Sequence, residues 1–171
     1  MPRTFLGVSS FLPYYLQSCG LLLLPVLVWN MALYRYLPPA YASAAYSRDI
    51  PGSLMFVENV LRFAVFALPF LMPLRLVTRE QRVGLMVFVV GTLVYFASWL
   101  LLIAVPESTW ARSALGFLSP VYTPALWLMG LAIVGRQLFW FRVYRPWMYA
   151  VLAGGFLLAH IAHAAIVYAR H

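Results

Sequence analysis

Lysine is absent from this sequence: its twelve basic side chains are all arginine, and only four side chains are acidic. Charged residues make up 9% of the 171 residues, whereas a soluble domain contains about a quarter. This scarcity of charge excludes an ordinary soluble domain, and the all-arginine pattern is typical of a GC-rich bacterial source. The single cysteine, Cys19, excludes a framework of disulfides within the chain.

Several enzyme signatures are also missing. The chain has no P-loop, no nucleophile elbow, no zinc-protease helix and no carboxylate-rich phosphotransferase motif. The formal net charge of +8 would suit nucleic-acid binding, but the arginines stand at the ends of apolar runs and do not form one solvated face. We therefore expect no nucleic-acid partner, and membrane lipids are the expected surroundings.

Hydrophobic residues, in contrast, make up 64% of the chain. They gather in five runs, and a helix of about 20 apolar residues is long enough to cross a bilayer. We predict an all-α fold, a single domain that is an integral membrane bundle of five transmembrane helices. The expected spans are residues 16–36, 53–76, 83–105, 114–138 and 147–169.

Prolines and small residues predict how these spans pack. Pro69 and Pro73 in the second span free backbone carbonyls that neighbouring helices or water must satisfy. Pro120 and Pro124 lie near the start of the fourth span, so we expect its first turns to be irregular. Small residues at helical spacing favour close contact between helices. They are Gly84 and Gly91 in the third span, Gly130 and Gly135 in the fourth, and Ala150 and Gly154 in the fifth.

Arginine counts in the connections predict the orientation. The turns after the second and fourth spans are rich in arginine, and the other two loops are poorer. We expect a bacterial cytoplasmic (inner) membrane protein with its N-terminus in the cytoplasm and its C-terminus outside. A signal peptide of the usual length, about 15–30 residues, does not fit the N-terminal pattern, so we expect the first run to remain a span. The arginines counted on the cytoplasmic side are Arg75, Arg79, Arg82, Arg136, Arg142 and Arg145.

Two charged residues interrupt the second span. Glu58 and Arg62 are four residues apart with the acid first, which places them on one helix face as an ion pair. Charges inside a membrane are costly, so the pair either lines a water-accessible cavity or joins packed helices. In a cavity, Arg62 could hold a carboxylate or phosphate. We expect Asn59 to point about 100° away and to bond to a neighbouring helix.

Two histidines, His160 and His163, share one face of the fifth span. They could exchange protons with Glu58, bond to neighbouring helices, or supply two ligands to a metal. We predict no cofactor, because two histidines without cysteine or a nearby carboxylate make a poor metal motif. A metal held by His160 and His163 is the less favoured alternative.

The predicted topology brings hydrogen-bonding side chains of all five spans to one level. At a helical rise of about 1.5 Å per residue, they lie roughly 6 to 15 Å below the outer surface. The predicted ligand-binding residues are Arg62, Glu58, Asn59, Asn30, Tyr95, Ser98, Tyr122, Thr123, His160 and His163, and the candidate catalytic groups are Glu58, His160 and His163. We expect most tyrosines to anchor the chain at the interface, with a ligand entrance as the alternative for Tyr14, Tyr34, Tyr36, Tyr41 and Tyr46.

Three hypotheses for function follow from these features. The leading one is a membrane protein that binds or transports a small amphipathic or anionic molecule at a polar site in the outer half of the membrane. The second is a membrane-embedded enzyme acting on a lipid or isoprenoid, with Glu58 and the histidines as acid–base groups. The third is an accessory subunit of a larger membrane complex, and a homo-oligomer is also open.

Overall fold

The computed structural model describes residues 17–140 and 143–170. Every regular element within these ranges is a helix, and the one isolated β-bridge there joins Ser18 to Pro73. The all-α prediction is therefore confirmed for the described residues. In chain order the helices are η2 (Cys19–Leu23), α2 (Leu24–Leu33), η3 (Tyr34–Tyr36), η4 (Pro39–Tyr41), α3 (Ser43–Tyr46), α4 (Gly52–Ala67), η5 (Leu68–Leu71), α5 (Arg79–Ala104), α6 (Thr109–Arg112), α7 (Ala114–Phe117), α8 (Ser119–Tyr122), α9 (Pro124–Val134) and α10 (Pro146–Tyr168), where η marks a 3₁₀ helix.

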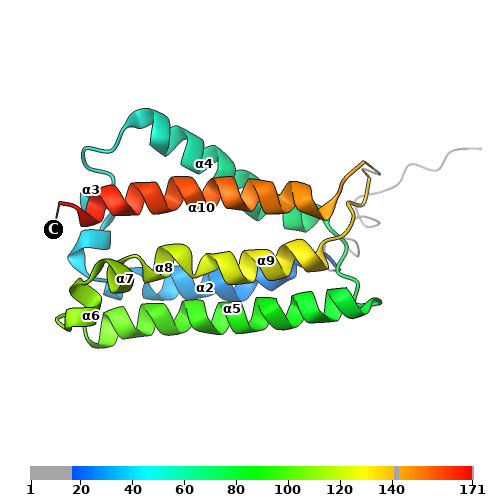
Figure 1. Cartoon of the computed structure of the whole chain (residues 1–171), viewed down its shortest axis with the longest axis horizontal. Helices are drawn as coiled ribbons and strands as arrows, with labels where there is room; N and C mark the ends of the chain where they lie inside the picture. Colours follow the sequence, from blue (N-terminus) through cyan, green and yellow to red (C-terminus); the bar gives the residue numbers. More distant parts are fainter. Residues whose placement is uncertain (1–16, 141–142, 171) are drawn as a thin grey trace, which may run out of the picture.

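Four helical segments of the described chain are long and apolar enough to cross a membrane. Figure 1 shows the bundle that they form, with its connections gathered at the two ends and α4 inclined to α10. Their length and composition indicate a membrane protein. The four segments are Cys19–Tyr36, Gly52–Leu71, Arg79–Ala104 and Pro146–Tyr168.

The fourth predicted span, residues 114–138, is a series of short helices. Its longest continuous apolar part, Ser119–Val134, is shorter than the four segments above. Pro120 lacks the N–H that would bond to the Gly116 carbonyl, and the Ser119 hydroxyl donates to that carbonyl instead, at 2.7 Å. Helix α9, the last of the series, ends at Val134, before Gly135. The series still runs beside α5 for most of its length (Figure 1).

The second span ends at Leu71, five residues before the predicted position 76. Pro69 cannot donate to the Val65 carbonyl, and that carbonyl accepts from the Tyr149 hydroxyl of α10 at 3.2 Å. A neighbouring helix therefore satisfies one carbonyl freed by proline, as predicted. Beyond Leu71 the Met72 backbone is extended, and its carbonyl accepts from the Cys19 N–H at 2.8 Å.

The third span begins at Arg79, four residues before the predicted position 83. Thr78 and Gln81 form a capping box, in which each side chain accepts a backbone N–H of the other. The Gln81 amide also donates to the Val134 carbonyl at the end of α9, at 3.3 Å. Polar side chains thus extend this helix beyond its apolar run.

Glycines bring α5 and α9 into backbone contact, as predicted. A Cβ at Gly130 would lie 2.3 Å from the Phe88 nitrogen, and one at Gly91 would lie 2.5 Å from the Trp127 nitrogen. Only glycine allows two helices to approach this closely. The packing predicted at Ala150 and Gly154 is not found: Ala150 is exposed, and no atom lies within 4 Å of a Cβ built at Gly154.

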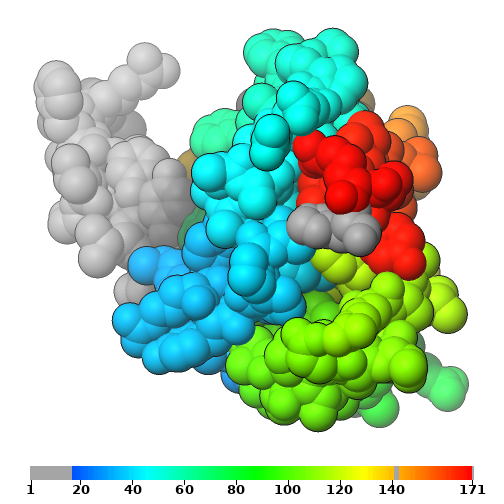
Figure 2. Space-filling model, turned by 90° about the vertical axis from the view of Figure 1, so that its left-hand side faces the viewer, coloured from blue at the N-terminus to red at the C-terminus, as the bar shows by residue number. Residues whose placement is uncertain are grey.

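The connection between α2 and α4 covers one end of the bundle. Figure 2 views this end, where the connection (cyan) meets α2 (blue), the end of α10 (red) and residues 105–118 (yellow-green). The Tyr41 hydroxyl donates to the Phe117 carbonyl, and the Arg170 guanidinium donates to the Arg48 carbonyl. The first bond joins η4 to α7, and the second joins the turn after α3 to the residues that follow α10.

Candidate functional site

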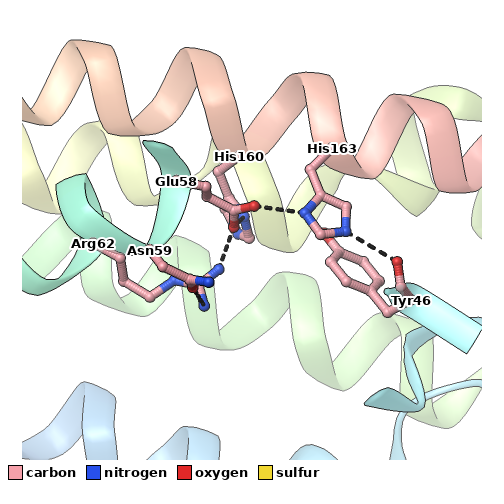
Figure 3. Close-up of polar contacts among 6 residues, drawn as sticks. All are labelled: Tyr46, Glu58, Asn59, Arg62, His160 and His163. Atoms are coloured by element: carbon pink, nitrogen blue, oxygen red, sulfur yellow. Dashed lines mark hydrogen bonds and ion pairs between the residues drawn. The ribbon is translucent and has the colours of Figure 1, made fainter. Parts of the chain in front are cut away.

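Glu58 lies at the centre of a cluster of charged and polar side chains (Figure 3). Helix α4 supplies Glu58, Asn59 and Arg62 within one turn, and α10 supplies His160 and His163 from its facing side. The Glu58 side chain is almost completely buried, with 1% of the residue exposed. A buried carboxylate in an apolar helix needs partners for both oxygens.

Both Glu58 oxygens have such partners. Oε1 accepts a hydrogen bond from the Arg62 guanidinium and lies 2.8 Å from Nδ1 of His160. Oε2 lies 2.5 Å from Nδ1 of His163. The predicted i, i+4 pair of Glu58 and Arg62 is therefore present. The structure joins it to His160 and His163, which lie 102 and 105 residues after Glu58 in the sequence.

His163 has a second partner at its other ring nitrogen. Nε2 lies 3.0 Å from the backbone carbonyl of Tyr46, and the Tyr46 ring stacks on the imidazole with 4.5 Å between ring centres. Burial, followed by the nearby Glu58 carboxylate, raises the pKa of the Tyr46 hydroxyl well above its usual value, so this group stays neutral. Sequence reasoning missed the carbonyl, because no side-chain pattern marks it.

Asn59 lies beside Arg62 and not against a neighbouring helix as expected. Its Oδ1 accepts from Nη1 of Arg62 at 3.3 Å, because a residue three positions earlier in a helix is within reach of a long side chain. The guanidinium carbon lies 6.0 Å from the centre of the Phe156 ring, and the same ring stacks on His160 at 5.2 Å. Phe156 thus supports both groups, a role that its sequence context does not reveal.

The cluster borders a cavity of about 970 Å³, at the upper end of the range for ligand pockets. Most of the wall is apolar or aromatic and comes from α2, α4, α5, α8, α9, α10 and the connection before α4. Tyr34, Tyr41 and Tyr46 line it, Tyr36 does not, and Tyr14 lies outside the described residues. The predicted ligand-binding residues in the wall are Asn30, Glu58, Asn59, Arg62, Tyr95, His160 and His163.

Three predicted ligand-binding residues do not line this cavity. Ser98 donates to the Tyr95 carbonyl at 2.7 Å, and Thr123 donates to the Ser119 carbonyl at 2.6 Å. The Tyr122 hydroxyl donates to the Leu115 carbonyl at 3.1 Å. The Ser98 bond lies within α5, the Thr123 bond reaches back to the first residue of α8, and the Tyr122 bond joins α8 to α7. Tyr95 differs, because its hydroxyl crosses to Asn30 Oδ1 at 2.7 Å and joins α5 to α2.

The arrangement favours ion and proton chemistry. Among the described residues, no group of three or more histidine, cysteine, aspartate or glutamate side chains is placed to hold a metal. Both histidines turn Nδ1 toward one carboxylate, and Arg62 keeps 43% of its side chain exposed. The cluster can therefore hold an anion or exchange protons. Comparison with models of known families, with curated proteins and with solved structures found no match to this chain.

Proposed function

We propose that this chain is a polytopic membrane protein that binds a small amphipathic molecule inside its bundle, either to retain it or to transport it. The cavity carries this proposal. Its volume of about 970 Å³, its largely apolar wall and its one charged cluster suit a ligand with a hydrocarbon part and a polar head group.

The proposed topology has five spans. The series from α7 to α9 is the span added to the four long segments. It lies alongside α5, and its part Ser119–Val134 is apolar. Arginine gathers at the end of the bundle opposite α3, which we assign to the cytoplasm of a bacterial cell. The cluster then lies in the outer half of the inner membrane. The described arginines at that end are Arg75, Arg79, Arg82, Arg136 and Arg145, while Arg142 lies outside the described residues.

Lateral entry from the membrane is supported by Phe63. This residue lines the cavity, yet 77% of it is exposed. The cavity therefore reaches the outer surface of the bundle beside α4, where lipid tails would lie. A ligand dissolved in the membrane could enter there without passing through water.

Filling the cavity is expected to weaken binding. We expect saturable binding of tritiated C12 amphiphiles, tested as dodecanol and dodecanoate, to purified protein in maltoside micelles. Ala67 lines the cavity, and Ala67→Phe should weaken binding about tenfold or more, because overfilling a packed site costs about 1–3 kcal/mol. The matched control is Ala165→Phe on the exposed face of α10, which should bind as the unmodified protein does. Absence of saturable binding of both amphiphiles would refute the proposed function.

A second candidate function is hydrolysis or isomerisation of a lipid. One observation favours it: Nδ1 of His160 contacts Glu58, and Nε2 has no hydrogen-bond partner within the described chain although the residue lines the cavity. A carboxylate that orients an imidazole in this way can prepare it as a general base.

This candidate predicts a large catalytic effect at His160. If the protein hydrolyses a chromogenic dodecanoyl ester, His160→Gln should lower kcat about 100-fold or more, the usual worth of a general base. Tyr122→Phe, which removes a hydroxyl outside the cavity, should leave kcat unchanged. Equal turnover in His160→Gln and the unmodified protein would rule out His160 as the base.

A further inference from the structure

We infer that the charged cluster carries a net positive charge, and that the head group it holds is therefore an anion. The ligand class is an anionic amphiphile, with a carboxylate or a phosphate ester at one end of a hydrocarbon chain. This inference rests on the proposed function and specifies the ligand of that site.

The proton count begins at His163. The Tyr46 carbonyl can only accept, so Nε2, at 3.0 Å from it, carries a hydrogen. Nδ1 and Glu58 Oε2 are 2.5 Å apart, and two acceptors cannot face each other at that distance without a proton between them. If that proton is on nitrogen, the pair is an imidazolium and a carboxylate. If it is on oxygen, both groups are neutral. The pair has zero net charge in either case.

The remaining members of the cluster add at least one positive charge. His160 lies with Nδ1 2.8 Å from Glu58 Oε1, and an imidazole paired with a carboxylate in this way adds no negative charge. Arg62 is always protonated in proteins. Asn59 carries no charge, and the Tyr46 hydroxyl is neutral. The positive charge that remains is thus set by the proton shared between His163 and Glu58, since without it Glu58 would cancel Arg62.

No other acid in the chain balances this charge. The chain has four acidic side chains, and the three besides Glu58 lie near arginines elsewhere. Asp49 lies near Arg48 and Arg170, Glu80 lies 4.0 Å from Arg136, and Glu107 pairs with Arg112. An unbalanced charge within an apolar span is costly. An anionic ligand would remove that cost.

Arg62 and Asn59 are placed to receive such an anion. Both line the cavity, and Asn59 accepts from Arg62 through Oδ1, which leaves its NH₂ group as a donor. Arg62 uses Nη2 for Glu58, and 43% of its side chain is exposed. Carboxylates and phosphates share the acceptor geometry that a guanidinium recognises. The hydrocarbon chain would lie along Phe63 and Phe66.

The first experiment compares probes that differ only in the head group. Binding of dodecanoate, dodecyl phosphate, dodecanol and dodecyltrimethylammonium is measured on the full chain in the same maltoside micelles, with acetate and inorganic phosphate as competitors without a chain. We expect both anionic amphiphiles to bind about 10- to 100-fold more tightly than dodecanol, the worth of a hydrogen bond to a charged group. We expect the trimethylammonium probe to bind more weakly than dodecanol.

The second experiment changes the charge of the cluster and reads the ratio of the dodecanol Kd to the dodecanoate Kd. Arg62→Gln and His163→Gln each cancel the net charge, so the ratio should fall toward one. Glu58→Gln removes the carboxylate together with the proton that it shares with His163, so Arg62 stays unbalanced and the ratio should not fall. The matched control is Arg112→Gln, which removes an arginine from an exposed pair outside the cluster and should keep the ratio. If the cluster only supports the fold, Glu58→Gln should lower the ratio more than Arg62→Gln does. Glu58 is the partner that Arg62 and both histidines share.

Each outcome decides between the claims. Saturable binding with a ratio near one in the unmodified protein would overturn the inference and leave the proposed function intact. A ratio that falls in Glu58→Gln but not in Arg62→Gln would also overturn the inference. If acetate or inorganic phosphate displaced the probe as well as dodecanoate does, the ligand would be a free anion and the inferred amphiphile would be wrong. No saturable binding of any probe would overturn the proposed function itself.

Discussion

Replacing Glu58 by leucine should lower the free energy of unfolding by about 3 kcal/mol or more, within the range for breaking one partner of a buried ion pair. Glu58 is almost fully buried and accepts from Arg62 and contacts two imidazoles. The histidines can lose their protons, but the guanidinium cannot. The cost should lie at the lower end of the range, because Arg62 borders the cavity. Unfolding in mixed SDS–maltoside micelles measures the change.

Two further variants separate this effect from a general loss of an acid. Glu107 pairs with Arg112 at an exposed position, so Glu107→Leu should change the free energy of unfolding by less than about 1 kcal/mol. The double variant Glu58→Leu with Arg62→Leu should recover at least half of the loss, because it leaves no uncompensated charge. A single Glu58→Leu change that costs no more than Glu107→Leu would mean that Glu58 is not the buried partner of Arg62 and the two imidazoles.

Local spacing predicts part of this cluster from the sequence. Glu58 and Arg62 are four residues apart on one helix, so their contact needs only helical geometry. The same reasoning places His160 and His163 on one face of α10. The contact of these histidines with Glu58 depends on how the spans are arranged. The sequence indicates this contact only because the predicted depths of the three residues in the membrane are similar. Depth does not specify rotation about the helix axis, which is why Ser98 and Thr123, predicted at the level of the cluster, do not line the cavity.

Other parts of the structure lie beyond side-chain patterns. The Tyr46 carbonyl is a backbone group in the short helix α3, and no side-chain pattern predicts that a backbone group will face His163. Hydropathy predicted residues 114–138 as one span, whereas Pro120 and Pro124, which remove backbone bonds, predicted its irregular first turns. At the start of α5, hydropathy likewise missed four polar residues, Arg79–Arg82, because the capping box of Thr78 and Gln81 stabilises them without apolar side chains.

The contact between α5 and α9 leads to the second large effect. A Cβ at Gly130 would lie 2.3 Å from the nitrogen and 2.6 Å from the Cα of Phe88, and 2.7 Å from the Gly84 carbonyl oxygen. All three atoms belong to the backbone, so no side chain can rotate away. We expect Gly130→Ala to lower the free energy of unfolding by about 3 kcal/mol, the upper end of the cost of overpacking, in the same micelle assay.

Gly154→Ala is the matched control for this change. It makes the same substitution inside α10, where nothing lies within 4 Å of the added Cβ, and alanine is the better helix former by about 1 kcal/mol. Gly154→Ala should therefore leave the free energy of unfolding unchanged or raise it slightly. If the two variants were equally stable, α5 and α9 would have to be further apart than the structure places them. The cavity wall that α5 and α9 contribute through Tyr95 and Trp127 would then have a different form.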